Sequence, residues 1–280
     1  MTTDVNRSPA VNEGIEIAKT IAYALLIALA LRIFLFQPYT IPSASMEPNL
    51  YEGDYIIVSK FSYGYSRHSI PFSPPLFHGR ILNHAPTAGD IIVFKLPREA
   101  ATTRVDYIKR LIGVPGDKIQ VKQGLLYING KPIVRTPEAP GQEDMGGGMI
   151  EPVARYQETL PNGRTFLTNS YGNDNPADNT GVYVVPPHCY FMMGDNRDNS
   201  LDSRFDPAMP SSMTGTSTCA WDSSVDKYVA NDAGVGFVPE EDLVGRARII
   251  LLSWKPGASL FKPWTWVLNF RPSRSFHLLK

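Results

Sequence analysis

One long apolar run near the N-terminus constrains this chain more than any other feature. Residues 21–36 read IAYALLIALALRIFLF, and Arg32 is the one charged residue among them. With Thr20 added, the run would form a helix about 26 Å long, slightly short of a hydrocarbon core of about 30 Å. Lys19 and Arg32 lie near its ends, where long basic side chains can reach the head groups. The sequence therefore predicts a transmembrane helix over residues 15–36.

A cleavable signal peptide is the alternative interpretation of this run. The small residues Ser43-Ala44-Ser45 follow it and look like a cleavage site. However, the run is longer than the apolar core of a usual signal peptide, and the residues before it are not strongly basic. We therefore expect an uncleaved, single-pass anchor that follows a polar, disordered N-terminus at residues 1–14.

Composition points to a β-rich body. The chain has 280 residues, ample for a buried core, and its formal net charge is zero. That balance provides no basic surface for nucleic acid, which is therefore not an expected partner. The 24 prolines and 22 glycines mostly separate short apolar runs, a pattern typical of strands joined by turns.

The chain has two cysteines, Cys189 and Cys219. They form no C-x-x-C pair, so a structural zinc site is not expected. Cys189 begins the apolar run Cys189–Met193, where a free buried thiol is common. This favours a free thiol, although a disulfide remains open if the body folds in an oxidising compartment.

Short apolar runs bounded by turn residues predict strands at 54–60, 90–96, 105–112, 181–185, 189–193 and 243–254. Asn129-Gly130 between two such runs is the clearest hairpin signal, and 153–168 resembles a second hairpin. Loops are expected at 61–88, 136–149 and 206–236, which are rich in Pro, Gly and polar residues.

Ser45 is a candidate nucleophile. It lies between Pro42 and Pro48, which restrict the local backbone, and it follows Phe36 at the end of the apolar run by nine residues. It is therefore expected near the membrane surface. A serine considered alone is more often a turn or capping residue, so this assignment depends on a suitable base elsewhere in the chain.

Lys109 is the candidate base. It stands in the predicted strand Asp106–Ile112, where side chains alternate between faces, so Lys109 and Arg110 point in opposite directions. If Tyr107 and Lys109 face inward, burial lowers the lysine pKa and makes a neutral amine available as a general base. The alternative is a surface lysine at a strand edge.

A third segment, Gly194–Arg204, reads GDNRDNSLDSR and is too polar to be the interior of a strand. A calcium loop is excluded because the glycine at its sixth position and the glutamate at its twelfth are absent. The segment fits a hydrogen-bonding clamp instead, in which a serine such as Ser200 holds an amine and Asp/Arg pairs fix the loop.

Together these segments resemble the motif boxes of bacterial type I signal peptidases, which are membrane-anchored proteases with a Ser/Lys pair. The matching stretches are Pro42–Met46, Gly89–Phe94, Tyr107–Asp117, Gly194–Arg204, and Gly236–Pro239 with Leu243–Ala247. Their order and spacing agree across residues 20–250. Ala44 departs from the pattern, since glycine is common at that position.

The resemblance implies a role for each matching residue. Ser45 is similar to the family's nucleophile, Lys109 to its general base, and the Ser43 hydroxyl with the Ser45 backbone N–H to its oxyanion hole. Ser200 is similar to the serine that orients the lysine. The supporting charged residues would be Arg110, Asp195, Asp202 and Arg204, and the lining of the substrate pockets would be Ile41, Pro42, Met46, Leu50, Tyr107 and Ile108.

The implied fold is mainly β: an antiparallel catalytic core with an inserted second β-region on one N-terminal transmembrane helix. We expect the catalytic core at 37–117 and 186–255, with the loop or ribbon 61–88 and the insertion 206–236. The second β domain is expected at 118–185. The tail 256–280 carries Trp264 and Trp266 among basic residues, and lying at the membrane surface or packing on the body fits it equally well.

The implied function is removal of N-terminal signal peptides from secreted preproteins after an Ala-x-Ala site. The expected location is the bacterial inner membrane, with the catalytic body on the periplasmic side. The expected partners are preproteins and the lipid bilayer, the expected state is a monomer, and no metal or other cofactor is expected.

Two other functions remain open. A pilin-maturing peptidase would use similar chemistry, and a tethered β-domain could act as an envelope scaffold without catalysis. A Ser-His-Asp protease would need one of five histidines, and none of them lies in a matching motif.

Overall fold

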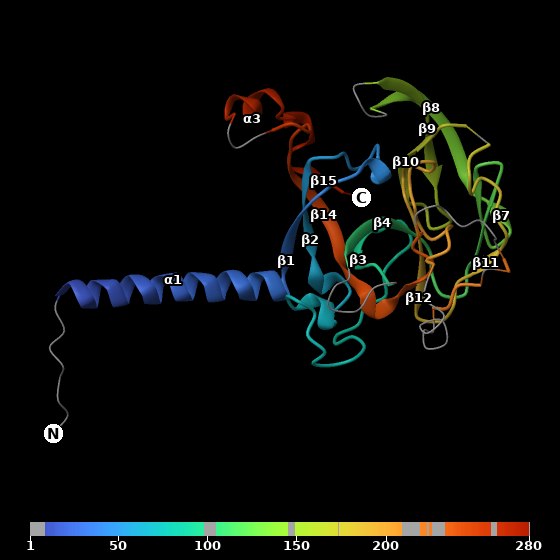
Figure 1. Cartoon of the computed structure of the whole chain (residues 1–280). Helices are drawn as coiled ribbons and strands as arrows, with labels where there is room; N and C mark the ends of the chain where they lie inside the picture. The colour runs from blue at the N-terminus through green and yellow to red at the C-terminus, as the bar shows by residue number, and fades with distance from the viewer. Residues whose placement is uncertain are drawn as a thin grey trace.

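The computed structural model describes residues 9–97, 105–144, 149–172, 174–208, 219–222, 224–225, 233–258 and 262–279. Helix α1 (Pro9–Phe34) projects from a β-rich body, and the short helix α3 (Trp264–Leu268) lies near the C-terminus (Figure 1). The strands are β1 (Phe36–Thr40), β2 (Asp54–Ser59), β3 (Ile91–Lys95), β4 (Asp106–Gly113), β5 (Lys118–Lys122), β6 (Leu125–Ile128), β7 (Lys131–Pro132), β8 (Val134–Asp144), β9 (Ile150–Thr159), β10 (Thr165–Ser170), β11 (Tyr183–Val184), β12 (Cys189–Met193), β13 (Val238–Pro239), β14 (Leu243–Ser253) and β15 (His277–Leu278).

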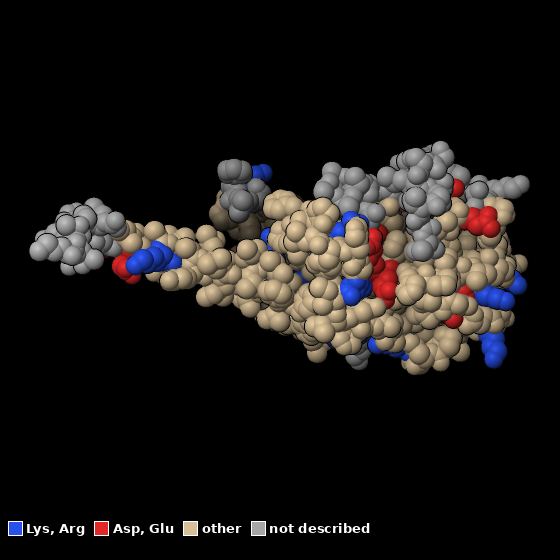
Figure 2. Space-filling model, turned by 90° about the horizontal axis from the view of Figure 1, so that it is seen from below, with Lys and Arg blue, Asp and Glu red and all other residues tan. Residues whose placement is uncertain are grey.

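Within α1, Glu13–Phe34 is long and apolar enough to cross a membrane, and none of it is buried against the body. Figure 2 shows charged atoms near the outer end of this helix and an uncharged flank between them and the body. The predicted bounds, 15–36, and the predicted disorder of residues 9–14 are wrong. Helix α1 begins at Pro9, since proline suits a first helical position, and ends before Phe36, which begins the pairing of β1 with β2.

The predicted β class is confirmed: an antiparallel sheet forms the centre of the described body. Its strand order is β1-β2-β14-β3-β4-β12-β13, and β15 pairs with β14. The sheet curls, so that strands far apart in this order approach one another around the body (Figure 1). Residues 61–88, predicted as a loop or extended ribbon, contain short 3-10 turns within η2 (Lys60–Ser62) and η3 (Arg67–Ser69), one isolated antiparallel bridge between Tyr65 and Ile81, and no named strand.

Two smaller sheets complete the described body, with orders β11-β5-β6-β7 and β10-β9-β8. The hairpin predicted at Asn129-Gly130 is confirmed by the pairing of β6 with β7. The loop predicted at 136–149 is wrong, because β8 runs through residues 134–144. Pro137 and Pro140 make this segment look like a loop in the sequence. The strand tolerates both prolines because it is at the edge of its sheet.

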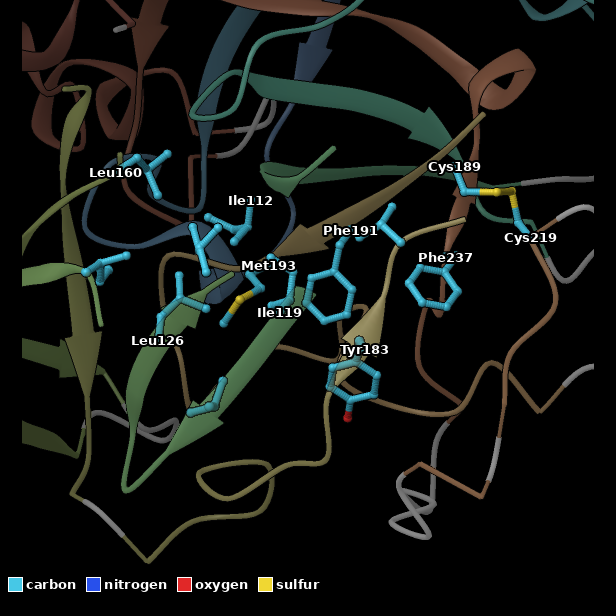
Figure 3. Close-up of a cluster of buried hydrophobic side chains, with 14 of the residues drawn as sticks. Ile112, Ile119, Leu126, Leu160, Tyr183, Cys189, Phe191, Met193, Cys219 and Phe237 are labelled. Carbon is cyan, nitrogen blue, oxygen red and sulfur yellow. A yellow bond between two sulfur atoms is a disulfide. The ribbon is translucent and has the colours of Figure 1, made fainter. Parts of the chain in front are cut away.

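A large hydrophobic cluster joins β12 to the second β-region (Figure 3). Ile112, Ile119 and Phe191 are buried within it, and the disulfide between Cys189 and Cys219 lies at its border. The free thiol favoured by the sequence is therefore wrong. Local sequence around Cys189 could not reveal that residue 219 returns to the same cluster. The greater part of the predicted insertion 206–236 lies outside the described residues.

The C-terminal tail is tied to the central sheet. The Arg271 guanidinium donates to the Trp254 carbonyl oxygen, and the Arg274 guanidinium donates to Asp54. These basic side chains therefore hold the tail in place, whereas Trp264 and Leu268 of α3 stay exposed. The division of the chain at residues 117, 185 and 255 remains a prediction.

Candidate active site

Ser45 lies in a 3-10 turn, η1 (Ala44–Met46), directly after β1. The Ala44 carbonyl oxygen accepts a hydrogen bond from the Glu47 backbone N–H (3.0 Å), which closes the turn. Met46 is fully buried in a hydrophobic cluster with Leu50 and anchors the turn from below. This anchoring leaves the Ser45 side chain only partly buried, with its hydroxyl facing a cleft.

Lys109 comes from β4 and meets Ser45. Its Nζ donates a hydrogen bond to the Ser45 Oγ across 2.6 Å, and the side chain is only 4% exposed. The Nζ also lies 5.9 Å from the centre of the Tyr107 ring, on the same face of the strand. The neighbouring Arg110 points to the other face, as the alternation of side chains along a strand requires.

Burial lowers the pKa of Lys109 to about 8, because the charged amine has lost most of its contact with water. The carboxylates of Asp202 and Asp195 oppose this by favouring the ammonium, and the Arg204 charge acts in the same direction as burial. About a tenth of the Lys109 side chains therefore carry a neutral amine at pH 7, in contact with a serine hydroxyl.

The segment Gly194–Arg204 supports this pair through two buried ion pairs. The Arg110 guanidinium donates to both oxygens of Asp195 at 2.7 and 2.8 Å, and its plane lies over the Phe166 ring. The Arg204 guanidinium binds Asp202 at 2.9 Å. Although burial alone would raise it, the Arg204 charge and hydrogen bonds hold the pKa of Asp202 below its usual range.

Gly194 brings this segment against the Ser45 turn. A Cβ at Gly194 would lie 2.3 Å from the Ser200 Oγ and 2.6 Å from the Ser45 carbonyl oxygen, closer than atoms can approach. The Asn196 backbone N–H donates to that same carbonyl oxygen at 3.2 Å. Ser200 lines the cleft beside Lys109, but its buried Oγ has no hydrogen-bond partner within the described residues, so the expected contact with the lysine is not formed.

Glu143 is a supporting residue that sequence analysis missed. Its buried carboxylate accepts hydrogen bonds from the Tyr171 hydroxyl (2.6 Å), the Asn196 amide (2.6 Å) and the Asn199 amide (3.1 Å). Because Asn196 also contacts the Ser45 turn, Glu143 links strand β8 to the site. Only recognition of β8 as a strand could have revealed this.

The cleft at Ser45 encloses about 530 Å³ and is lined by several of the predicted substrate-binding residues. Pro42, Tyr107 and Ile108 lie on its wall. The prediction that Ile41, Met46 and Leu50 line the substrate pockets is wrong. These three side chains are buried in the hydrophobic cluster beneath the cleft and are not among its lining residues. Their long apolar side chains anchor β1 and the Ser45 turn to the core.

Ser43 is exposed at the mouth of the cleft, and its Oγ lies 3.3 Å from the Ser45 Oγ. A hydroxyl at this position and the backbone N–H of Ser45 can both reach an oxygen atom next to the nucleophile. Among the described residues, no group of three His, Cys, Asp or Glu side chains is arranged as a metal site.

A second serine in the body contacts a histidine. The His68 Nδ1 is hydrogen-bonded to the Ser73 Oγ at 2.9 Å, and the His68 Nε2 lies 3.2 Å from Asp242. All three side chains are buried, and none lines the cleft at Ser45. This arrangement resembles a catalytic triad by residue type, but Ser73 has no access to a peptide in the cleft.

Comparison with known proteins identifies the family of this chain. The model of the family "Signal peptidase, peptidase S26" matches residues 14–254, which include every box described above. The chain belongs to this family. It is 39% identical over 245 residues to signal peptidase I of Rickettsia canadensis, covering 85% of this chain and 79% of the relative. It is 40% identical over 243 residues to signal peptidase I of Rickettsia rickettsii, covering 84% and 78%.

Among solved structures, a signal peptidase I from Enterococcus faecalis V583 is similar at 24% identity, covering 58% of this chain and 97% of that chain, with a TM-score of 0.27. Family membership makes this chain a hydrolase, a serine endopeptidase of the class that removes signal peptides. Its N-terminal apolar helix fits a membrane anchor.

Proposed function

We propose that the chain cleaves secretory preproteins after an Ala-x-Ala site, with Ser45 as nucleophile and Lys109 as general base. The observation that carries this proposal is the 2.6 Å contact between the Lys109 Nζ and the Ser45 Oγ. The lysine is buried, and burial lowers its pKa to about 8, the direction that a general base requires near neutral pH.

In the proposed reaction, neutral Lys109 takes the proton of the Ser45 hydroxyl as the Oγ bonds to the scissile carbonyl carbon. The resulting oxyanion accepts hydrogen bonds from the Ser43 hydroxyl and the Ser45 backbone N–H, each worth about 2–4 kcal/mol. The C–N bond then breaks, and the Lys109 ammonium donates its proton to the leaving amine. A water molecule, deprotonated by Lys109, hydrolyses the acyl-enzyme and restores Ser45.

The substrate is proposed to bind as an added strand beside β4. Strand β3 pairs with β4 along Asp106–Arg110, whereas β12 pairs with β4 only from Arg110 onward. Within the described residues, the segment Asp106–Lys109 therefore has a strand neighbour on one side only, and its other edge faces the cleft. An extended peptide could pair there, with small side chains at its −1 and −3 positions against the apolar wall.

The proposed location is the bacterial inner membrane, with α1 as a single span and the body on the periplasmic side. The disulfide between Cys189 and Cys219 supports an oxidising compartment for the body. Trp264 and Leu268 are exposed on α3, which suits an interface with lipid in addition to the span. The proposed partners are preproteins and the bilayer, and the proposed state is a monomer.

The experiment uses detergent-solubilised full-length protein and a preprotein that has alanine at −3 and −1. We expect one cleavage, directly after the −1 alanine, identified by sequencing the new N-terminus. A matched preprotein with leucine at −1 should be cut far more slowly. Equal cleavage of both substrates would contradict the Ala-x-Ala proposal. Cleavage of a prepilin-type substrate alone would favour a pilin-maturing peptidase, and no cleavage by folded protein would favour a scaffold.

A further inference from the structure

A small polar pocket of about 110 Å³ lies where α1 joins the body. It shares Asp106 with the lining of the Ser45 cleft. Its lining includes Arg32 in the last turn of α1, Lys60 directly after β2, and Lys95 at the end of β3. The loop after β2, cyan in Figure 1, lies beside this end of the helix. The Lys60 backbone N–H donates to the Leu35 carbonyl oxygen at 2.9 Å and fixes the junction.

Among the described lining residues of this pocket, Arg32, Lys60 and Lys95 are basic and one residue is acidic. Asp106 is the acidic residue of the lining, and its carboxylate lies 2.9 Å from the Lys95 Nζ. Lys60 is 2% exposed and donates to the Ser69 carbonyl oxygen at 2.7 Å, and within the described residues it forms no ion pair. Burial, with the nearby charges of Arg32 and Lys95, lowers the pKa of Lys60 to about 8, although Asp106 opposes the shift.

Three apolar loop residues form one edge of the pocket, here called its rim: Ile70, Pro71 and Phe72. Phe72 lines it, yet its side chain is 92% exposed. The backbone holds it there with a φ of 64°, in the left-handed region, and the next residue, Ser73, is held by its hydrogen bond to His68. Leu76, four residues further along the loop, is also 71% exposed. An exposed aromatic ring beside basic side chains suits a ligand that has a negatively charged head group and an apolar tail.

The position of Arg32 along α1 indicates how deep the pocket lies relative to the membrane surface. The segment capable of crossing a membrane ends at Phe34, so Arg32 lies in its last turn, at the level where acyl chains give way to head groups. A basic pocket at that depth can take a lipid phosphate, whereas a soluble anion would gain nothing from the apolar rim.

We propose that Arg32, Lys60 and Lys95 form a binding site for the phosphate of an anionic phospholipid head group, with Phe72 against the start of its acyl chains. The site does not depend on the proposed proteolytic mechanism. Asp106 lines both this pocket and the Ser45 cleft, so the bound lipid would lie against the first residue of the strand that carries Lys109.

The test measures lipid binding to detergent-solubilised full-length protein by native mass spectrometry, with phosphatidylglycerol and phosphatidylcholine as probes. Phosphatidylglycerol should be retained preferentially. Arg32→Gln and Lys95→Gln should each weaken its binding about five-fold, the effect of removing one basic residue. Asp106→Asn should strengthen binding, a change that misfolding would not produce. Lys19→Gln is the matched control at the other end of α1 and should have no effect.

Equal retention of the two lipids, or identical binding by wild type and the Arg32, Lys95 and Asp106 variants, would overturn the proposal. A third probe, inorganic phosphate, distinguishes the sources of the anion. If phosphate alone binds as tightly as phosphatidylglycerol and displaces it stoichiometrically, the pocket is a soluble-anion site and the lipid assignment is wrong. Weak competition at millimolar concentration or above supports the lipid.

Discussion

The Lys109 Nζ lies 2.6 Å from the Ser45 Oγ, although 64 positions separate the two residues in the chain. Ser45 follows β1 at one edge of the central sheet, whereas Lys109 belongs to β4, and β2, β14 and β3 lie between these strands. The curl of the sheet therefore brings these two segments, which are far apart in the strand order, into contact.

Cleavage should increase with pH through the pKa of Lys109. Burial lowers that pKa to about 8, and only the neutral amine can accept the Ser45 proton. At pH 7 about a tenth of the lysine is then neutral, so kcat/KM should increase close to ten-fold per pH unit from pH 6 to 7 and level off above about 9. Initial rates of cleavage of one preprotein, measured over a series of pH values, test this rising limb of the pH–rate profile.

His68→Gln is the control for that profile. His68 is buried against Ser73 and Asp242, outside the cleft, and should leave the midpoint of the pH profile in place. A midpoint near 6.5 that disappears in His68→Gln would assign the limb to a histidine instead and contradict the role of Lys109.

Gly194→Ala should slow cleavage about 100-fold with little loss of secondary structure. The added methyl group would collide with the Ser200 Oγ and the Ser45 carbonyl oxygen, so the Ser45 turn must move away from Lys109. A displacement near 1 Å at a catalytic pair costs about 100-fold in rate. Gly14→Ala, where a Cβ would meet nothing within 4 Å, is the matched control and should cleave at the wild-type rate. Full activity in Gly194→Ala would show that the two segments are not in contact.

Asp195→Asn should destabilise the protein far more than an equivalent change at the surface. It leaves the buried Arg110 guanidinium without its carboxylate partner, and breaking such a pair costs about 3–5 kcal/mol. Glu16→Gln breaks the exposed pair with Lys19 and should cost about 0–1 kcal/mol. Thermal unfolding of both variants in the same detergent makes the comparison, and equal melting temperatures would refute the structural role of Asp195.

An element of this structure is predictable from the sequence when its own residues carry the pattern that defines it. The strand of Lys109 has a regular apolar pattern, and the Asn129-Gly130 hairpin has its own turn signal, so both are predictable locally. Strand β8 is not, because Pro137, Pro140 and the neighbouring glycine indicate a loop, and only its position at a sheet edge permits them.

Some residues of the candidate site are likewise recognisable from local sequence, and others only from the folded structure. Ser45 and Lys109 are identified by their motifs, whereas the contribution of Glu143 depends on the position of β8 and carries no local signal. Ile41 and Met46 match the family's pocket lining in sequence, yet their side chains pack beneath the cleft, because motif position does not specify which way a side chain points. Ser200 matches the motif in sequence in the same way, yet its hydroxyl forms no hydrogen bond with Lys109 or any other described residue.

Loss of the disulfide between Cys189 and Cys219 should lower stability without removing the catalytic pair. The bond closes a loop with a sequence separation of 30, which corresponds to about 3–4 kcal/mol in the chain-entropy account. A double Cys→Ser variant should therefore melt at a lower temperature and still cleave a preprotein below that temperature. Unchanged melting, or loss of cleavage in folded protein, would contradict this separation of roles.

The most direct test of the central claim compares wild type with Ser45→Ala and Lys109→Met on one preprotein with an Ala-x-Ala site, each variant first shown to unfold cooperatively. The account predicts cleavage after the −1 alanine by wild type and a rate reduced by at least about 1,000-fold in both variants, since the two residues act as one unit. Cleavage that persists in Lys109→Met would leave Ser45 without its proposed base and contradict the Ser/Lys mechanism.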